Sequence, residues 1–289
     1  MMNSTHVKWL PEHTITNALI TGDAHGSTDR FTYLFKKLGK EIMKHTAILI
    51  LGDAGFDYYL NKTDRKKKQQ LQETGAIYYL VRGNHEQRPE LVDDIEMGWD
   101  NYVDNYVYFH PDFLNIRYLI DGLTYNYDGY RCLVIGGAYS VDKEYRLSRG
   151  APYYWFEGEQ LTPEERERIS GIVDHDMLCG AGYDFIFSHT CPLKFVPTDL
   201  FLAQVNQDTV DKSMEVWLDE IEEKADYTCW CFGHYHENRW EPMRYNASLG
   251  EWIIPRARQL FTDVVDINKI YKEAKRLKEI EENDKENDV

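Results

Sequence analysis

The chain has 289 residues, of which 43% are hydrophobic and 14% aromatic, a composition that excludes a disordered protein and allows one large domain or two small ones. Its net charge of −16 argues against long nucleic acid as a partner, because proteins that grip nucleic acid neutralise phosphates with a basic surface. No stretch approaches the roughly 20 apolar residues that span a bilayer, no secretion signal is visible, and the five cysteines are irregularly spaced, so we expect reduced thiols in a cytoplasmic protein without a membrane partner.

Six short apolar runs lie along the chain, and each passes directly into glycine and polar residues. They are rich in β-branched and aromatic residues and apolar on both faces, which is the pattern of central strands covered on both sides. In chain order, the predicted strands are residues 17–21, 46–51, 76–81, 131–135, 183–187 and 227–232.

Helical patterns separate several of these strands. Thr162 has the features of an N-cap, because Pro163 occupies the first turn and Glu165 can close a capping box. The alternation of strands and helices predicts a layered α/β fold. The predicted helices are residues 28–40, residues 62–73, a segment that starts at Thr162, and residues 210–224.

Two hairpin patterns add antiparallel strands to this fold. Asp128 and Gly129 lie between strand-like flanks, and a second turn is predicted near residues 248–250. These hairpins favour a sandwich of two sheets with helices outside over one open sheet. We expect a single domain over residues 1–266, followed by a charged helix that frays into an acidic tail over residues 267–289.

The polar residues that end the strands form the candidate site. Ligands of layered α/β folds bind beyond the carboxyl ends of the strands, so these side chains are expected to meet there. A mixture of carboxylate, amide and imidazole groups suits manganese, iron, zinc or nickel better than calcium or magnesium. The residues are Asp23, His25, Asp53, Asn84, His85, His189, His234 and His236.

The spacing of these residues indicates how they can share two ions. Asp23 and His25, two positions apart, can aim at one ion, and His234 and His236 repeat that spacing near the other end of the chain. Asp53 can bridge two ions with its two oxygens. Two ions about 3.5–4 Å apart can clamp a phosphoryl group and create a hydroxide at neutral pH.

His85 follows Asn84 directly and cannot easily point the same way, so we expect it to face the substrate. There it can protonate the leaving oxygen or stabilise charge on the phosphoryl group. Asp57 could orient this imidazole, since catalytic imidazoles often pair with a carboxylate, but we favour a loop aspartate without that role.

The order Asp-x-His, Gly-Asp, Gly-Asn-His-Glu, His and Gly-His-x-His over residues 20–236 resembles the calcineurin-like metallophosphoesterase superfamily. The resemblance implies a four-layer α/β/β/α sandwich of two mixed β-sheets flanked by helices, with a dimetal site at the strand carboxyl ends. It also implies attack on phosphorus by a metal-bridging hydroxide, with His85 as the catalytic residue. One ion would be held by Asp23, His25, Asp53 and His236, and the other by Asp53, Asn84, His189 and His234.

Two further segments refine the resemblance. Residues 52–57 lack the arginine of the Asp-Arg-Gly segment found in serine/threonine phosphoprotein phosphatases, whereas residues 136–146 and 188–192 resemble a group of bacterial and phage metallophosphoesterases. We therefore expect a phosphatase or phosphodiesterase that uses two divalent transition-metal ions, with manganese favoured over iron, zinc or nickel, on a small phosphorylated substrate. The alternatives are a nuclease or cyclic-nucleotide phosphodiesterase of the same superfamily, and a non-catalytic protein-binding scaffold.

A loop over residues 139–157, rich in aromatic and basic residues, is expected at the rim of the site. Its aromatics could stack a nucleotide base and its cations could hold phosphate, or the loop could simply be anchored by its own aromatics. The basic run at residues 65–68 is interpreted as a solvated helix face. The candidate substrate contacts are Arg82, Arg88, Tyr139, Lys143, Arg146 and Trp155.

Overall fold

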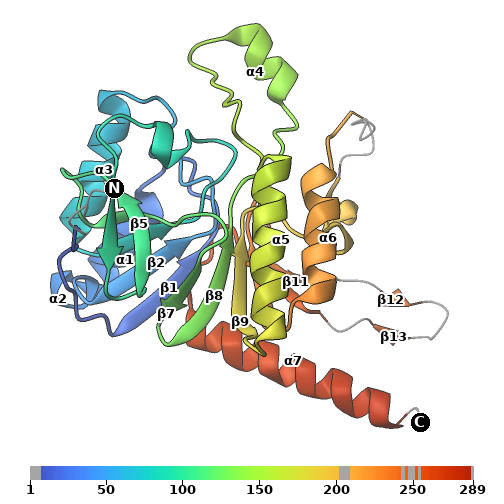
Figure 1. Cartoon of the computed structure of the whole chain (residues 1–289). Coiled ribbons are helices and arrows are strands. Elements are labelled where there is room, and N and C mark those ends of the chain that lie inside the picture. The colour runs from blue at the N-terminus through green and yellow to red at the C-terminus, as the bar shows by residue number, and fades with distance from the viewer. Residues whose placement is uncertain (1–7, 202–208, 242–244, 247–250, 253–254, 288–289) are drawn as a thin grey trace, which may run out of the picture.

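Two β-sheets lie face to face at the centre of the protein, and helices cover the outer face of each sheet (Figure 1). The structure, a computed structural model, describes residues 8–201, 209–241, 245–246, 251–252 and 255–287. The layers follow one another as helices, sheet, sheet and helices, which confirms the predicted four-layer sandwich.

The first sheet has seven strands of mixed direction. In spatial order they are β15 (Val265–Asp266), β1 (Asn17–Thr21), β2 (Thr46–Ile50), β3 (Ile77–Leu80), β6 (Ile116–Tyr118), β5 (Asn105–Phe109) and β4 (Glu96–Asp100). The central strands β1, β2, β3 and β6 run parallel, while β15 and β5 run against them.

The second sheet has six strands. In spatial order they are β11 (Arg239–Glu241), β14 (Ala257–Gln259), β10 (Tyr227–Phe232), β9 (Tyr183–Ser188), β8 (Tyr130–Ile135) and β7 (Thr124–Tyr127). The four middle strands are parallel, and the two edge strands β11 and β7 are antiparallel to their neighbours. All six strands predicted from apolar runs are present, as β1, β2, β3, β8, β9 and β10.

Both predicted hairpins have counterparts in the structure. Asp128 and Gly129 join β7 to β8 with φ angles of 57° and 87°, so both residues of the turn are left-handed as a tight hairpin requires. Near the C-terminal end, β12 (Tyr245–Asn246) and β13 (Glu251–Trp252) form a separate antiparallel pair. The turn predicted near residues 248–250 lies outside the described residues.

The apolar core between the sheets is built from the inward faces of both. Ile20 and Leu49 contribute from the first sheet, and Phe187 and Cys231 from the second, each with no more than 1% of its surface exposed. Burial of these faces fixes the register of the strands, because a slip by one residue would turn the apolar set outward. The strand ends are therefore held at defined positions.

Three helices cover the first sheet and two cover the second. Phe31 and Leu71 pack in one cluster with Tyr78 of the first sheet, whereas Ile169 and Leu218 pack in another with Trp230 of the second. The first group is α1 (Asp29–Leu38), α2 (Lys40–Met43) and α3 (Lys62–Thr74), and the second is α5 (Pro163–Leu178) and α6 (Ser213–Lys224).

The helix boundaries follow local chemistry. At the start of α5, Thr162 accepts a hydrogen bond from the backbone of Glu165, whose side chain accepts one from the backbone of Thr162, so the predicted capping box is present. The helix predicted over residues 28–40 ends at Gly39, whose φ of 80° separates α1 from α2.

Short helices and one long helix complete the fold. The long helix, α7 (Ile267–Asn287), runs along the end of the sandwich opposite α4 (Lys143–Arg149), which projects on its own (Figure 1). The start of α7 coincides with the predicted boundary, but Ile267, Ile270 and Ala274 are buried in the core between the sheets. No helix among the described residues is long and apolar enough to cross a membrane. The remaining turns are the 3-10 helices η1 (Pro89–Leu91), η2 (Leu193–Phe195) and η3 (Thr198–Leu200).

Candidate metal centre

Five loops that follow parallel strands meet at one edge of the sandwich. Three come after β1, β2 and β3 of the first sheet, and two come after β9 and β10 of the second. Parallel strands present their carboxyl ends at the same edge, so the loops of two facing sheets converge there. The structure brings together all eight strand-end side chains of the candidate site, Asp23, His25, Asp53, Asn84, His85, His189, His234 and His236.

Asp53 lies at the centre of the contacts. Its Oδ1 is 3.4 Å from Nε2 of His189. Its Oδ2 is 3.9 Å from Nδ1 of His25 and 3.8 Å from Nε2 of His85. The carboxylate thus faces three imidazoles with its two oxygens, an arrangement that suits a ligand shared by two cations.

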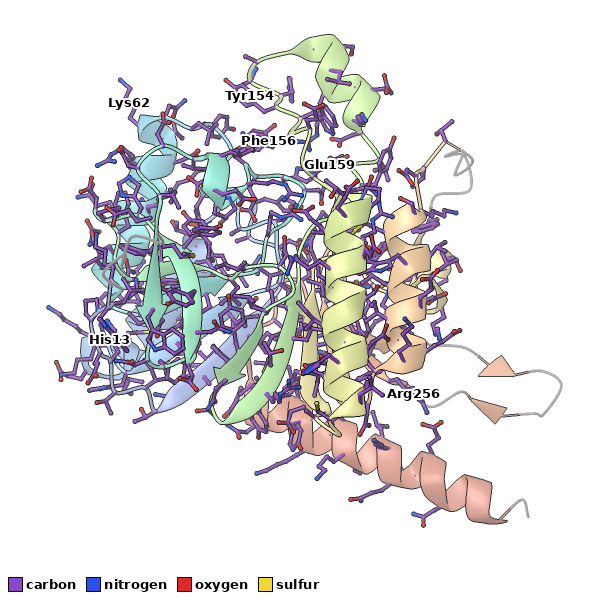
Figure 2. All side chains as sticks on the ribbon, viewed as in Figure 1. His13, Lys62, Tyr154, Phe156, Glu159 and Arg256 are labelled. Carbon is purple, nitrogen blue, oxygen red and sulfur yellow. The ribbon has the colours of Figure 1, made fainter. Side chains whose placement is uncertain are left out.

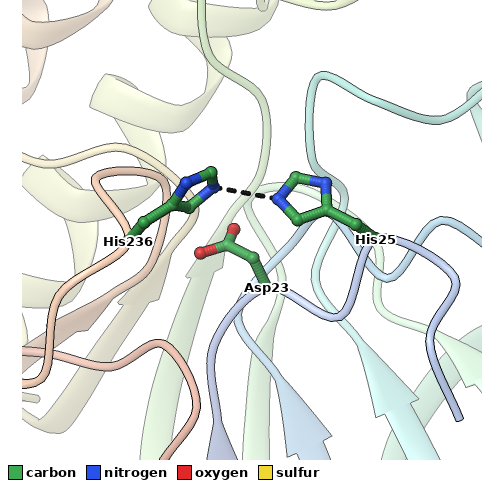
Figure 3. A group of neighbouring side chains, drawn as sticks. All are labelled: Asp23, His25 and His236. Carbon is green, nitrogen blue, oxygen red and sulfur yellow. Dashed lines mark hydrogen bonds between the residues drawn. The ribbon is translucent and has the colours of Figure 1, made fainter.

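Asp23, His25 and His236 form a neighbouring group whose potential ligand atoms all lie within 4.8 Å of one another (Figure 3). Nε2 of His25 is 2.9 Å from Nε2 of His236, and the two rings are nearly perpendicular, at an interplanar angle of 87°. Asp23 also accepts a hydrogen bond from the backbone N–H of His234, and its Oδ1 lies 3.5 Å from Nδ1 of His189. Asp23 therefore connects this group to the one around Asp53.

The contact between His189 and Asn84 shows that positive charge is favoured here. Nδ1 of His189 lies 2.9 Å from the carbonyl oxygen of Leu51 and must donate to it. Nε2 then faces Oδ1 of Asn84 at 2.8 Å, while the Asn84 amide nitrogen donates to Ser140. Two acceptor atoms do not approach so closely without a proton or a cation between them. The geometry therefore requires a protonated His189 or a metal ion.

The buried carboxylates also favour positive charge at the centre. Asp23 and Asp53 are almost fully buried, and burial raises the pKa of Asp23 to about 7, with the charge of Asp53 adding to the effect and His189 opposing it. Burial also disfavours the charged form of His189, but the attraction of Asp53 outweighs it and raises the pKa of His189 to about 9. The centre thus holds two buried carboxylates against one cationic imidazole, and Asp23 is the carboxylate whose pKa stays raised.

The other imidazoles are neutral, as metal ligands must be. Burial lowers the pKa values of His25 and His236, and it lowers the pKa of His234 well below the usual range. Lone pairs of these rings are therefore available to cations at neutral pH.

The backbone is left-handed at four of the eight residues. Such φ angles are uncommon for residues with a Cβ atom, cost on the order of 1–3 kcal/mol each, and cluster at functional sites. The surrounding loops hold these residues in place through backbone bonds, for example from the N–H of His25 to the carbonyl of Asp53 at 2.8 Å. The φ angles are 46° at His25, 46° at Asp53, 68° at His234 and 59° at His236.

Glycine is required at two positions beside the cluster. Gly52 has a φ of +84°, and a Cβ atom there would lie 2.2 Å from Nδ1 of His189. A Cβ atom at Gly83 would lie 2.1 Å from Oδ1 of Asp53. Only glycine lets these loops approach the two side chains so closely.

His85 is oriented by an arginine that the sequence suggested as a substrate contact. Nη2 of Arg146 lies 2.6 Å from Nδ1 of His85, and Nη1 of Arg146 donates to the carbonyl of Tyr154 at 3.0 Å. Nη2 of Arg146 also lies 3.2 Å from Nε2 of the same ring. Because a guanidinium only donates, the nearer nitrogen Nδ1 is the better placed acceptor, and a neutral ring then carries its proton on Nε2, which lies 3.8 Å from Asp53. Burial lowers the pKa of His85 to about 4, with Asp53 opposing the shift and Arg146 adding to it.

Two residues that support the cluster were not identified from sequence. Ser140 accepts the amide of Asn84 at 2.8 Å and so fixes which atom of that amide faces the centre. Glu86 accepts the backbone N–H groups of Gly55 and Gly83, both at 2.9 Å, and so ties two of the loops together. The Gly-Asn-His-Glu motif was a signal for Glu86, whereas no local pattern marked Ser140.

Arg82 and Arg88 do not reach the cluster. Arg82 is buried and donates to Asp121 and to the carbonyl oxygens of residues 136, 158 and 159. Arg88 pairs with Glu165 at 2.7 Å and donates to two further carbonyl oxygens. Protein acceptors engage both guanidinium groups, and the assignment of the two arginines as substrate contacts stays a prediction.

We define the arm as residues 139–159, the segment that carries α4 away from the sandwich and back (Figure 1). The aromatic side chains of the arm contact each other or the loop after β2. Tyr154 and Phe156, on the segment that returns from α4 to the sandwich (Figure 2), pack on Tyr58 of that loop. The ammonium of Lys143 lies 4.2 Å from the ring centre of Trp155, so these two candidate contacts pair with one another. The arm is therefore anchored by its own side chains.

The basic run on α3 is not a uniformly solvated face, which corrects that interpretation. Lys68 is buried and its Nζ lies 2.5 Å from Oδ1 of Asp57, whose other oxygen accepts from Tyr118. Lys67 lines a cavity of about 120 Å³ together with His25 and His85. Both lysines face inward because α3 packs against the loop that follows β2, and Asp57 is therefore engaged away from His85.

A larger pocket of about 560 Å³ opens beside the cluster. Of the candidate substrate contacts, Tyr139 belongs to its wall. The strand-end residues among its described lining are Asp53, Asn84, His85, His234 and His236.

Comparison with known proteins connects this geometry to a family. A family model described as calcineurin-like phosphoesterase matches residues 16–238. Among proteins with curated descriptions, none matches the chain. Similar solved structures include TT1561 of Thermus thermophilus, at 12% identity and a TM-score of 0.43 over 89% of this chain and 96% of that one. They also include a phosphopantetheinyl hydrolase from Mycobacterium tuberculosis, at 13% identity and a TM-score of 0.38 over 86% of this chain and 89% of that one.

Proposed function

The chain belongs to the calcineurin-like phosphoesterase family of metal-dependent enzymes, and from this premise we propose that it hydrolyses a small phosphorylated substrate with two divalent transition-metal ions. The proposal rests above all on the convergence of carboxylate, amide and imidazole groups from both sheets at one edge of the fold. The proposed ligands are Asp23, His25, Asp53, Asn84, His189, His234 and His236.

The donor set fits a pair of cations. The described residues include three groups of histidine and aspartate whose potential ligand atoms lie within 4.8 Å of one another, and Asp23, His25 and Asp53 each belong to two of them. Of these, Asp53 faces three imidazoles with its two oxygens. We therefore assign the bridging position to Asp53. Two buried carboxylates among neutral imidazoles favour a transition metal over magnesium or calcium, and manganese is the ion we propose first.

The roles of the protein groups follow from their geometry. Bound divalent ions would lower the pKa of water and neutralise charge on the phosphoryl oxygens. His85 is neutral at rest because burial lowers its pKa, so it can act as the general acid only after taking up a proton, whereas its neutral N–H can donate a hydrogen bond to the leaving oxygen. Proton transfer by a positioned side chain contributes typically about 10²–10⁴-fold to a rate. Arg146 holds the ring in that orientation through Nδ1.

The size of the pocket supports a small substrate. About 560 Å³ lies within the range of small-molecule sites, and the net charge of −16 disfavours long nucleic acid. A nucleotide has less support, because Trp155 is occupied by Lys143 and is not free to stack a base. A phosphomonoester and a phosphodiester both remain within the proposal.

The test measures activity and metal content together. The protein reconstituted with Mn²⁺ should cleave 4-nitrophenyl phosphate, bis(4-nitrophenyl) phosphate or both, and should hold two ions per chain. His85→Ala is expected to lose roughly 10²–10⁴-fold in turnover while keeping both ions. His175→Ala, a control at an exposed histidine outside the site, should behave like the wild type. Failure of the wild type to cleave either ester with Mn²⁺, Ni²⁺, Zn²⁺ or Fe²⁺ would contradict the proposal.

A further inference from the structure

The pocket beside the metal centre has two chemically different sides. One side is formed by the strand-end residues, including Asp53 and His85. The opposite side comes from the arm, from η2 and η3, and from the segment that leads into α6. Its lining is apolar over most of its extent, with Val141, Leu193, Val196, Leu200, Phe201 and Val210.

Val196 is buried in the core behind the wall, but other apolar side chains of the wall are only partly covered by the protein. Val141 exposes 70% of its surface and Leu200 exposes 38%, although both border the pocket. Apolar groups left open next to a cluster of polar catalytic groups are typical of a ligand site, where the apolar wall gives affinity and the polar groups give orientation. The wall is continuous with the centre, so a single molecule can touch both.

Three charged residues, Asp142, Lys212 and Glu215, interrupt the apolar wall, and of these Glu215 is the buried one. Glu215, in the first turn of α6, borders the pocket and is buried. Its Oε1 accepts from the hydroxyl of Thr190 at 2.7 Å, while its Oε2 has no hydrogen-bond partner among the described residues. A buried oxygen without a partner is costly and calls for an explanation.

The protein encloses this oxygen almost completely, and no donor among the described residues reaches it. The hydroxyl of Tyr235 lies 3.1 Å from Thr190, and Thr190 is already committed to Oε1. Burial raises the pKa of the Glu215 carboxyl, with the bond from Thr190 opposing the shift. A donor supplied by a molecule in the pocket would relieve the cost of burial.

We propose that this wall binds the organic group of the substrate, that this group is a mainly apolar chain or ring, and that it carries a hydrogen-bond donor that pairs with Glu215. The inference rests on the proposed function and narrows its substrate to esters of apolar alcohols. It separates them from nucleoside phosphates, whose sugar and base would bring several polar groups against an apolar surface.

The first experiment varies the substrate of the unaltered protein with Mn²⁺. Along methyl, butyl and hexyl phosphate, kcat/KM is expected to rise roughly three- to fourfold per methylene, the factor that burial of one methylene corresponds to. In Leu200→Asn, where an amide replaces a partly exposed apolar group, the rise should become shallower. Equal kcat/KM values along the series, or a preference for nucleoside monophosphates over hexyl phosphate, would overturn the proposal.

The second experiment addresses Glu215. 6-Hydroxyhexyl phosphate has a donor that 6-methoxyhexyl phosphate lacks, so the wild type should prefer the former by about tenfold or more, as for a hydrogen bond to a charged group. Glu215→Gln presents an amide that can donate to either ether or hydroxyl oxygen, so the preference should vanish. Glu220→Gln, an exposed control on the same helix, should retain it. A preference that persists in Glu215→Gln would contradict the assignment.

A binding measurement separates this inference from the proposed function. Hexylphosphonate and methylphosphonate resist hydrolysis, so their affinities can be compared by calorimetry without turnover. Tighter binding of hexylphosphonate with a negative heat-capacity change supports the apolar wall. Equal binding of the two overturns it even if every ester is cleaved, whereas absence of cleavage with preferential binding contradicts only the proposed function.

Discussion

The strand-end cluster and the arm around α4 differ in how firmly the rest of the chain fixes them. Asp23, Asp53 and His189 are at most 1% exposed and are held by loops whose backbones bond to one another. On the arm, Val141 and Tyr145 are largely exposed. The register of the buried strands thus positions the side chains of the strand-end cluster, whereas the arm shapes the pocket that would receive the substrate.

The largest effect is expected from a substitution at the centre of the cluster. Asp53→Asn removes the charge that faces three imidazoles, so turnover should fall by more than the roughly 10²–10⁴-fold that loss of a general acid produces, and at least one ion per chain should be lost. Turnover assays and elemental analysis measure both. Asp211→Asn, at an exposed aspartate, should change neither. Retention of two ions and full activity in Asp53→Asn would show that the cluster is not a dimetal site.

A smaller effect is expected where the arm meets the cluster. Arg146→Ala frees Nδ1 of His85, so turnover should fall on the order of 10–100-fold, as for other partners of catalytic or ligating histidines. Both ions should remain. Arg146→Lys should restore little, because an ammonium cannot bond to His85 and Tyr154 with the fixed fork of a guanidinium. Arg149→Ala, on the same helix, is the control, and equal losses in both variants would assign the effect to the arm as a whole.

Ser140 connects the two regions, because it belongs to the arm but accepts a hydrogen bond from the strand-end residue Asn84. Ser140→Ala leaves the Asn84 amide without its acceptor, so the affinity for one ion should weaken by roughly tenfold. A titration of the metal-depleted protein with Mn²⁺ measures this, and Ser148→Ala on α4 serves as the control. An unchanged affinity would mean that Asn84 keeps its orientation without Ser140.

The smallest effect concerns the first turn of α5, just after the arm ends, where Arg88 bonds both to Glu165 and to the carbonyl of Gly158. The carboxyl of Glu165 is partly buried, which would raise its pKa, but the bonds from Arg88 and the backbone of Thr162 outweigh burial and lower the pKa. A depressed pKa contributes stability above the unfolded value near 4.3, and the contribution is lost as the pH falls through the lower folded value. Glu165→Gln keeps the capping box but not the charge.

Urea unfolding checks this last prediction. Glu165→Gln should be less stable than the wild type at pH 7, and the difference should shrink as the pH falls below about 4. Glu164→Gln, at an exposed neighbour, should match the wild type throughout. A difference that does not depend on pH would point to packing and not to charge.

The sequence predicted the six central strands, the layers and the strand-end cluster because these obey local rules. An apolar run that passes into glycine and a polar residue identifies a strand and its loop together, as in the segment that ends at Gly52 and Asp53. Parallel pairing then brings such loops to one edge without further information. The strands β4, β6, β14 and β15 were not predicted because they are short and carry polar residues.

Contacts of long side chains escaped prediction because they depend on the path of distant loops. Arg82 was expected at the substrate but is buried among carbonyl oxygens of residues 136, 158 and 159. Lys67 was expected in solvent but lines a cavity with His85. A flexible stem of four bonds reaches partners in several directions, so sequence spacing alone does not determine its contacts.

The two halves of the cluster come from different sheets, with Asp53 following β2 of one and His189 following β9 of the other. A cation held by both residues would link the two sheets, so unfolding of the sandwich would have to release the cation. The melting temperature should then rise with the logarithm of the free Mn²⁺ concentration, and a chelator should lower it. Heat resistance would thus report on occupancy without any substrate at all.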